Sequence, residues 1–574
     1  MPSPSRTRPA PRLPALALAG LVPLAACAAD GRAPVAPPPT AAPPPVPSAT
    51  PDPPATSTPD DDPEARARAL VDDLAHHRYD AAAARFDPEL LQALPGPALG
   101  VLWQKIEEAG GPFARVEGAE STVESDLRVV RVICRFAHLR KVLRVIFGED
   151  GAIAGLYVEP HARDLEDAAR AVVDRLSRED WQGAGATFDA ILRGSLPPDK
   201  LHALWARTVK KSGAFVEVES AAIAAADGLA AVLLTCRFAS GAAVVKVVYD
   251  LRDQVAGFFI LPGDFLSPWR PPAYATPDRF TERDIAVGAN PALPGTLTLP
   301  KGSGPFPAVV LVHGSGPSDA DATQGPNRIF KDLAWGLASR DVAVIRYVKR
   351  TKHAPAGVAT IKEEVLEGAR AAVDLALHTR EIDPRKVVVV GHSQGGYLAP
   401  RIAAEVPGVA GIVLLAGPSR PLQDSLVDQL SYFLKLDPRN AEKQRMVTAA
   451  RECKARIEDP GLDPAASIEL PDGAHEKGSY FLSLRGYRPT EVAAGLTIPI
   501  LVLQGDRDYQ VTHADFEGWR RALAGRPGVT LKRYPALNHL FIAGSGTPRP
   551  GEYESPGHVD AAVVSDVAAF MGKL

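Results

Sequence analysis

Apolar runs alternate with amphipathic stretches through the second half of the chain. Continuous apolar runs, typical of strands covered on both faces, occupy 308–312, 387–390, 411–416 and 499–504, and further predicted strands occupy 342–347 and 529–534. Helical periodicity occurs between or after them, at 361–379, 397–406 and 559–570. Strands that alternate with helices predict an α/β domain built on a mostly parallel sheet.

The preceding region has a different texture and repeats itself. A shift of 102 positions superimposes two segments without a gap. The matches include Phe86-Asp87 with Phe188-Asp189, Leu102-Trp103 with Leu204-Trp205, and Cys134-Arg135-Phe136-Ala137 with Cys236-Arg237-Phe238-Ala239. Each copy opens with helical patterning, at 69–86 and 168–188, and closes with β-rich stretches. We therefore expect two tandem small α+β domains, at 64–160 and 164–262.

Neither copy contains a recognisable catalytic constellation. Cys134 and Cys236 alternate with apolar neighbours, and no His or acidic residue recurs beside both. A buried, inert thiol is the expected state of each. Trp103 and Trp205 are expected to anchor the two cores. The expected role of this region is therefore to bind a partner or to act as a spacer.

The first 26 residues have the pattern of a secretory signal peptide. Three arginines precede a 14-residue apolar stretch at 13–26, which is shorter than the ~20 residues of a membrane-spanning helix. The stretch ends in Leu-Ala-Ala-Cys27, which resembles the lipobox of bacterial lipoproteins. That resemblance implies lipidation of Cys27 and a membrane anchor, in the outer membrane of a Gram-negative host because Ala28 follows. Ordinary signal cleavage with an incidental Cys27 is the alternative.

Residues 27–63 are expected to form a tether. Proline occupies 13 of the 30 positions from 34 to 63. Such a segment cannot bury a core and favours extended polyproline II structure. A ligand for a proline-binding module is the rival interpretation, but no flanking signature supports it.

Composition narrows the classes of function. The 574 residues include 64 Lys+Arg and 68 Asp+Glu, with no basic block, so nucleic acid is not an expected partner. Four cysteines are too few for a disulfide scaffold. An apolar fraction of 46% is ordinary for a soluble globular protein.

A candidate nucleophile follows the run of four valines. Gly391-His392-Ser393-Gln394-Gly395 is a G-x-S-x-G element between a predicted strand and a predicted helix. A sharp turn there requires small residues two positions before and after the serine, and it lifts Oγ above the sheet edge. Ser393 is therefore the predicted nucleophile.

A serine nucleophile needs a base and an orienting acid, which follow this type of turn in the order Ser, Asp, His. The loop after 499–504 contains Asp506 and Asp508, and the loop after 529–534 contains His539. His539 is the predicted base, with His513 and His558 as weaker rivals. His392 lies in the turn itself and is expected to be held by packing.

Acyl transfer also needs N–H donors for the developing oxyanion. The Gln394 backbone N–H is one expected donor, because it follows the nucleophile at a helix start. The Ser315 N–H, in the loop after 308–312, is the second, and the Gly316 N–H is its alternative. His313 is expected to support this loop without transferring a proton.

Three segments carry a resemblance to bacterial serine hydrolases of the α/β-hydrolase fold: 313–352 (HGSGPSDADATQGPNRIFKDLAWGLASRDVAVIRYVKRTK), GHSQGG, and 480–512 (YFLSLRGYRPTEVAAGLTIPILVLQGDRDYQVT). The likeness is to the dienelactone-hydrolase, acyl-esterase and serine-aminopeptidase-like branches. It covers about 280–574, so 277–574 is expected to be an α/β-hydrolase domain. It favours Asp508 as the acid, three residues past Gly505, and leaves Asp506 to shape the turn through local backbone N–H groups. Val348 is a departure, because relatives often carry Asp there, and it weakens the expectation of a salt-bridged loop.

The resemblance extends to the other parts of the chain. The repeated segments are similar to a domain of unknown function found ahead of bacterial α/β-hydrolases, whose relatives look like the nuclear-transport-factor-like fold. In the hydrolase fold, the insertion at about 418–495 implies a lid over the active site, with helices at 422–436 and 441–457 and a polar loop at 459–478. Four lid aromatics could line a pocket or pack the lid: Tyr432, Phe433, Tyr480 and Phe481. Cys453 is expected to be a surface thiol or to pack.

We therefore predict a lipid-anchored serine hydrolase that cleaves carboxylic esters through an acyl-enzyme. Its partners would be a small-molecule ester or acyl substrate and, through the anchor, a membrane. No zinc-ligand spacing, phosphate-binding loop or nicotinamide fingerprint occurs, so no metal or cofactor is expected. A peptidase or amidase with the same triad is one alternative, and a non-catalytic envelope-binding protein acting through the repeats is another. The oligomeric state stays open.

Overall fold

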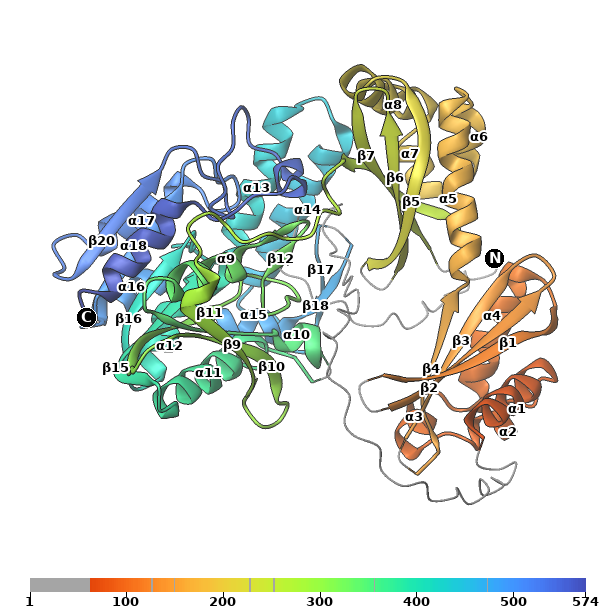
Figure 1. Ribbon diagram of the computed structural model, residues 1–574, viewed down its shortest axis with the longest axis horizontal. Helices are drawn as coiled ribbons and strands as arrows, with labels where there is room; N and C mark the ends of the chain where they lie inside the picture. The colour runs from red at the N-terminus through yellow and green to blue at the C-terminus, as the bar shows by residue number, and fades with distance from the viewer. Residues whose placement is uncertain are drawn as a thin grey trace, which may run out of the picture. The chain divides into compact units, whose positions relative to one another are not determined.

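The computed structural model describes residues 62–574 apart from 125–126, 149, 227–228, 251–252, 356 and 472. The signal peptide, the tether and Cys27 lie outside these residues. The described chain divides between Gly263 and Asp264 into two compact units (Figure 1). Within the described ranges, no helix has both the length and the apolar character needed to cross a bilayer.

The first unit contains the two copies, and each is four helices followed by a four-stranded antiparallel meander. Copy 1 comprises α1 (Pro63–Ala75), α2 (Tyr79–Ala83), α3 (Pro88–Ala93), α4 (Gly96–Gly110), β1 (Phe113–Glu124), β2 (Leu127–Phe136), β3 (Arg140–Phe147) and β4 (Ile153–Pro160). Copy 2 comprises α5 (Ala162–Ser177), α6 (Trp181–Ala186), α7 (Ala190–Ser195), α8 (Pro198–Ser212), β5 (Phe215–Ala226), β6 (Leu229–Phe238), β7 (Gly241–Tyr249) and β8 (Val255–Pro262). The predicted tandem α+β architecture is confirmed.

The two cores repeat the same aromatic packing. The Trp103 ring lies 5.7 Å from Phe113 and 5.4 Å from Phe136, centroid to centroid. Trp205 lies 5.8 and 5.7 Å from the rings 102 positions later, those of Phe215 and Phe238. Both tryptophans are at most 5% exposed, as expected of core anchors.

The helical stretch expected at the start of each copy consists of two helices rather than one. Each is broken into two helices by a residue in the left-handed region, His77 (φ 56°) and Glu179 (φ 61°), 102 positions apart. Neither residue is a glycine, so the sequence carries no signal for the break.

The second unit is built on an eight-stranded sheet in the order β20-β19-β16-β15-β11-β14-β10-β9. The strands are β9 (Phe280–Val287), β10 (Leu293–Pro300), β11 (Phe306–Val312), β14 (Ala343–Tyr347), β15 (Ile382–His392), β16 (Val409–Leu415), β19 (Ile500–Gly505) and β20 (Val529–Tyr534). β10 pairs antiparallel with both its neighbours, and the remaining pairs are parallel. The β9–β10 hairpin was not predicted, because β9 is mostly exposed and lacks an apolar run.

Helices cover both faces of this sheet, so the α/β prediction is confirmed (Figure 1). Val387 and Val389 pack into the core under α11 (Glu367–His378) and α12 (Gln394–Glu405). Val388 and Val390 pack into the opposite core, under α9 (Ile329–Ala338) and α18 (Ala561–Met571). A π-helical turn at Lys362–Leu366 precedes α11.

The insertion between β16 and β19 is largely helical. It contains α13 (Leu422–Leu436), α14 (Ala441–Glu458), β17 (Ser467–Glu469), β18 (His475–Lys477), α15 (Gly478–Leu484) and α16 (Pro489–Gly495). The predicted polar loop at 459–478 thus includes a short hairpin. Cys453 packs into the core at 1% exposure, so it is no surface thiol. The remaining elements are η1 (Pro277–Arg279), β12 (Thr323–Gln324), β13 (Asn327–Arg328), α10 (Arg350–His353), α17 (His513–Ala522) and η3 (Pro550–Glu554).

Candidate active site

Ser393 lies between β15 and α12 in a strained backbone conformation. Its φ and ψ are 54° and −117°, a region that non-glycine residues rarely occupy. The Ser393 N–H donates to the Leu415 carbonyl at 2.9 Å, and its own carbonyl accepts from the Tyr397 N–H at 2.9 Å. These bonds tie both sides of the strained residue to the neighbouring strand and helix.

Two glycines of the G-x-S-x-G element allow this turn by close backbone approach. A Cβ at position 391 would lie 2.1 Å from the Gly395 carbonyl oxygen, and one at 395 would lie 2.2 Å from the Val312 oxygen. Neither backbone atom can move aside, so any larger residue would displace the turn. The small-residue requirement inferred from the sequence therefore has a direct steric cause.

His539 and Asp508 meet behind this turn. Nδ1 of His539 lies 2.7 Å from Oδ2 of Asp508, and their side chains are 4% and 0% exposed. The carboxylate holds Nδ1 as the protonated nitrogen, which leaves Nε2 as the nitrogen that can exchange a proton. His539 follows β20 and Asp508 follows β19, at the carboxyl ends of parallel strands where the Ser393 turn also lies.

His392 connects this pair to the nucleophile. Its Nε2 lies 2.9 Å from the His539 carbonyl oxygen, and the two imidazole rings are 4.8 Å apart. Burial lowers the pKa of His392 to about 3, so the ring is neutral and donates this hydrogen bond. His392 is thus held by packing and by this hydrogen bond. Because His392 directly precedes Ser393, the bond also keeps His539 close to the nucleophile.

The two candidate acids have different partners. Asp508 Oδ1 accepts from the N–H groups of Gln510 (2.8 Å) and Val511 (2.9 Å), and Oδ2 accepts from Gln504 Nε2 at 3.1 Å. The carboxylate of Asp506 instead pairs with Arg533 Nε at 2.6 Å on β20. The expectation that Asp506 shapes the turn through local backbone N–H groups is wrong, because Asp508 takes those donors.

The other histidines lie away from this pair. His513 is exposed and faces Glu517 at 3.8 Å. His558 Nδ1 lies 3.0 Å from Asp332, which raises its pKa. His313 Nε2 bonds the Asp319 carbonyl oxygen at 2.9 Å, and burial lowers its pKa to about 3. A neutral ring that closes the loop after β11 fits the supporting role expected for His313.

The segments that carry the two expected oxyanion donors lie beside Ser393. Gln394 is the first residue of α12, so its N–H is one of the helix donors that have no intrahelical acceptor. A Cβ placed on Gly314 would lie 3.2 Å from the Ser393 Cβ, which brings the Gly314–Ser315 peptide beside the nucleophile. Gly316, the alternative donor, has a left-handed φ of 82°.

A buried ion pair lies against both donor segments, and sequence reasoning missed it. Lys349 and Glu364 are 2% and 5% exposed, with Nζ and Oε1 2.6 Å apart. Lys349 Nζ also donates to the Gly314 carbonyl oxygen at 2.9 Å and to Gln394 Oε1 at 3.1 Å. Tyr480 of the lid donates to Glu364 Oε2 at 2.6 Å. Val348, the departure noted in the sequence, thus adjoins a residue that does form a salt bridge.

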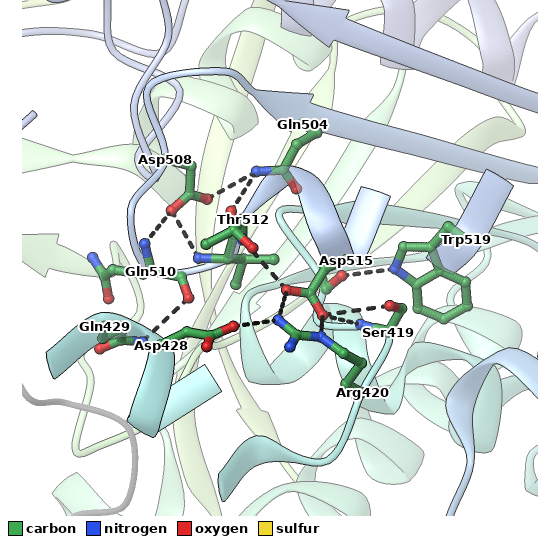
Figure 2. A network of polar contacts seen from close by, with 12 residues as sticks. Ser419, Arg420, Asp428, Gln429, Gln504, Asp508, Gln510, Thr512, Asp515 and Trp519 are labelled. Carbon is green, nitrogen blue, oxygen red and sulfur yellow. Dashed lines mark hydrogen bonds and ion pairs between the residues drawn. The ribbon is translucent and has the colours of Figure 1, made fainter. Parts of the chain in front are cut away.

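A second network holds the Asp508 loop (Figure 2). Gln504 Nε2 bonds both Asp508 and the Val511 carbonyl oxygen, so it spans the loop from one side. Asp515, fully buried on α17, accepts from the Thr512 N–H (3.3 Å) and from Arg420 (2.9 Å). Figure 2 shows these contacts continuing to Asp428 on α13. The loop is therefore tied to the base of the lid.

Three other groups of residues bear on what chemistry the chain can carry out: the repeat cysteines, the lid aromatics and possible metal ligands. Burial raises the pKa of Cys134 and of Cys236 to about 12, so both are inert thiols, as expected. Tyr480 and Phe481 are buried, and Tyr432 stacks on Tyr509 with ring centroids 5.5 Å apart. Within 62–574, excluding the gaps given above, no cluster of His, Cys, Asp and Glu could hold a metal ion.

Comparison with known proteins gives matches in both units. Residues 309–552 match the alpha/beta hydrolase family, and residues 67–156 and 169–258 each match a protein family of unknown function, DUF3887. The chain is 40% identical to Esterase EstD of Thermotoga maritima over 341 residues, which are 59% of this chain and 79% of the relative. It is 28% identical to the monoacylglycerol lipase of Mycolicibacterium smegmatis over 186 residues, 31% of this chain and 62% of the relative.

Solved structures also match about half of the chain. Est1E from Butyrivibrio proteoclasticus aligns with a TM-score of 0.34 and 18% identity, over 50% of this chain and 98% of its own. The esterase of Pyrococcus furiosus aligns with a TM-score of 0.33 and 18% identity, over 53% and 96%. The 40% identity over 79% of Esterase EstD, together with the family match over 309–552, shows that this chain belongs to the α/β-hydrolase family and is a hydrolase.

Proposed function

We propose that the chain hydrolyses carboxylic esters through an acyl-enzyme, with Ser393 as nucleophile, His539 as general base and Asp508 as its orienting acid. The hydrogen bond between His539 Nδ1 and Asp508 Oδ2, set against a strained serine turn, is the observation that carries this proposal. The similarity to Esterase EstD favours an ester as substrate.

The proposed cycle has two halves. His539 Nε2 removes the Ser393 proton while Oγ attacks the ester carbonyl, and the N–H groups of Ser315 and Gln394 bind the oxyanion. His539 then gives that proton to the departing alkoxide, which leaves as the alcohol. In the second half, His539 removes a proton from water, hydroxide attacks the acyl group, and the proton returns to Ser393 as the acid leaves.

A fluorophosphonate probe and p-nitrophenyl esters test this assignment. Wild-type protein should be labelled and should release p-nitrophenol, whereas Ser393→Ala should do neither. Retained labelling in Ser393→Ala would place the nucleophile elsewhere. Faster cleavage of aminoacyl anilides than of matched esters would favour a peptidase or amidase. Absence of labelling in folded wild-type protein would favour a non-catalytic protein that acts through its repeats.

The lipid anchor is a separate proposal that rests on the Leu-Ala-Ala-Cys27 sequence. Attachment of a diacylglycerol to the Cys27 sulfur would bury two acyl chains, at ~0.8 kcal/mol per CH₂, and would hold the protein on a membrane of the cell envelope. Cys27→Ser should move the protein from the membrane fraction to the soluble fraction. Unchanged membrane retention of that variant would contradict acylation at Cys27.

A further inference from the structure

We infer that Lys349 is a positioning residue for the oxyanion hole: its ammonium orients both the Gly314–Ser315 peptide and Gln394, the segments that carry the two proposed N–H donors. The inference rests on the proposed ester hydrolysis at Ser393. It starts from a buried cation that the proposed acid, base and nucleophile do not use.

The first contact acts on the same peptide group that supplies a donor. Lys349 Nζ binds the Gly314 carbonyl oxygen at 2.9 Å, and the Ser315 N–H belongs to that peptide. In a planar trans peptide the C=O and N–H bonds point in opposite directions, so holding the oxygen toward Lys349 aims the N–H away from it. A cation on the oxygen also polarises the amide and strengthens its N–H as a donor.

The second contact fixes the other donor. Gln394 is 1% exposed, and its side chain bonds Lys349 through Oε1 (3.1 Å) and Tyr480 through Nε2 (3.0 Å). With both ends of the amide held, the first residue of α12 cannot rotate its backbone N–H away from Ser393. One ammonium therefore sets the spacing between two segments that are 79 residues apart in sequence, Ser315 and Gln394.

The surroundings explain how a buried cation can serve this purpose. A lysine ammonium has three donors, and the bonds to Gly314, Glu364 and Gln394 use all of them. Glu364 neutralises the charge, and its second oxygen accepts from Tyr480. Burial, reinforced by Glu364, raises the pKa of Tyr480, so its hydroxyl keeps the proton that it donates. Because the pair is neutral overall, Lys349 acts on the groups that it contacts rather than through a net field over the site.

Arg346 supplies a matched control on the adjoining strand. It is 3% exposed and paired with Asp321 and Glu282, as deeply buried as Lys349. Its hydrogen bonds and ion pairs run to Asp321, Thr298 and Glu282, away from Gly314, Ser393 and Gln394. Substitution of Arg346 therefore reports the cost of losing a buried cation in this sheet without touching the proposed oxyanion hole.

The test compares Lys349→Met with Arg346→Met in the full chain, with active sites counted by fluorophosphonate titration. Loss of oriented donors should lower kcat for p-nitrophenyl butyrate by about 10²- to 10³-fold at nearly unchanged KM. Affinity for an aryl trifluoromethyl ketone, which forms a tetrahedral oxyanion on serine, should fall in parallel. Affinity for the matching methyl ketone should stay within about threefold, and Arg346→Met should keep kcat per active site within the same range.

Glu364 provides a second variant in case Lys349→Met does not fold. The double variant Lys349→Met/Glu364→Gln leaves no unpaired charge in the core. Continued loss of kcat and of trifluoromethyl ketone affinity in the double variant supports the inference. Recovery of both to wild-type values would overturn it, since Lys349 would then only neutralise Glu364. Wild-type protein that neither reacts with the probe nor cleaves esters would instead remove the proposed function, and the inference with it.

Discussion

At the scale of single residues, hydrogen-bond donors decide which carboxylate can serve the base. Asp508 accepts two backbone N–H groups and a glutamine amide in addition to His539, whereas Asp506 has an arginine on its exposed side. A carboxylate surrounded by fixed donors cannot swing away from the imidazole. The acid is therefore selected by the loop that encloses it.

This contrast gives a prediction for a matched pair of variants. Asp508→Asn should lower kcat for p-nitrophenyl esters by about 10⁴-fold, because an amide no longer holds the productive tautomer of His539. Asp506→Asn breaks an exposed ion pair with Arg533 and should keep kcat within about threefold. Steady-state kinetics on both proteins checks the result, and the opposite ranking would overturn the assignment of the acid.

The neutral buried histidines predict acid sensitivity. Burial lowers the pKa of His392 from 6.5 to about 3, so between these values the unfolded chain binds a proton that the native state excludes. Stability should therefore fall as pH decreases below about 6.5, at about 1.4 kcal/mol per pH unit for this one group. His392→Asn should remove about 1.4 kcal/mol per pH unit from that slope, which is the contribution of one proton. Urea unfolding followed from pH ~7 to pH ~4 measures the change. An unchanged slope would contradict the proposed neutral state.

At the scale of elements, α17 joins the acid loop to the lid through one carboxylate. Asp515 is fully buried and accepts from the Thr512 N–H, the Ser419 N–H and Arg420. Its removal would leave two backbone donors without a partner and the Arg420 guanidinium with Asp428 alone. The bonded network therefore predicts a stability effect far larger than that of an ordinary surface ion pair.

Asp515→Ala should accordingly destabilise the protein by about 3–5 kcal/mol and lower kcat by loosening the loop that carries Asp508. Glu517→Ala is the control on the same helix, because Glu517 pairs only with exposed groups; it should cost about 0.5 kcal/mol or less. Chemical denaturation and ester kinetics on both variants test the prediction. Equal costs for the two would show that the Asp515 network contributes little.

Elements and site residues with a local sequence pattern were predictable, whereas contacts between distant segments were not. Strands with continuous apolar runs, such as β11, β15 and β19, were predicted correctly because an apolar run is a local signal. Ser393 and His539 follow β15 and β20 in the structure. The Lys349–Glu364–Tyr480 network was missed, because its members come from segments up to 131 residues apart and none has a local pattern. Gln504 carried a weak signal, as the polar end of an otherwise apolar strand. The β9–β10 hairpin and the helix breaks at His77 and Glu179 had none.

At the scale of the whole molecule, the two copies share a fold but are not interchangeable. Arg131 of copy 1 pairs with Glu124, whereas Leu233 occupies the position of Arg131 in copy 2.

A single residue, His161, separates β4 of copy 1 from α5 of copy 2. Contacts between the copies also lack symmetry: Lys141 of copy 1 binds Asp253 of copy 2 at 2.6 Å, while the equivalent positions carry Ala243 and Gly151. The pair therefore belongs to the junction rather than to the repeat.

The ion pair between Lys141 and Asp253 predicts that loss of Lys141 destabilises the folded protein by an amount that depends on pH. Burial raises the pKa of Asp253 despite Lys141, so ionised Asp253 is stabilised chiefly by that one cation. A raised folded pKa means that Asp253 destabilises the native state as pH increases through it, and loss of the cation enlarges this effect. Lys141→Met should cost about 1–3 kcal/mol at pH ~7 and less at pH ~4, because the raised pKa of Asp253 favours the neutral carboxyl as pH falls. Urea unfolding of the full chain measures these changes. The double variant Lys141→Met/Asp253→Asn should recover most of the stability lost at pH ~7. Arg237 is an exposed control, and Arg237→Ala should change stability by about 0.5 kcal/mol or less. The same cost for Lys141→Met at both pH values would show that Lys141 contributes packing alone.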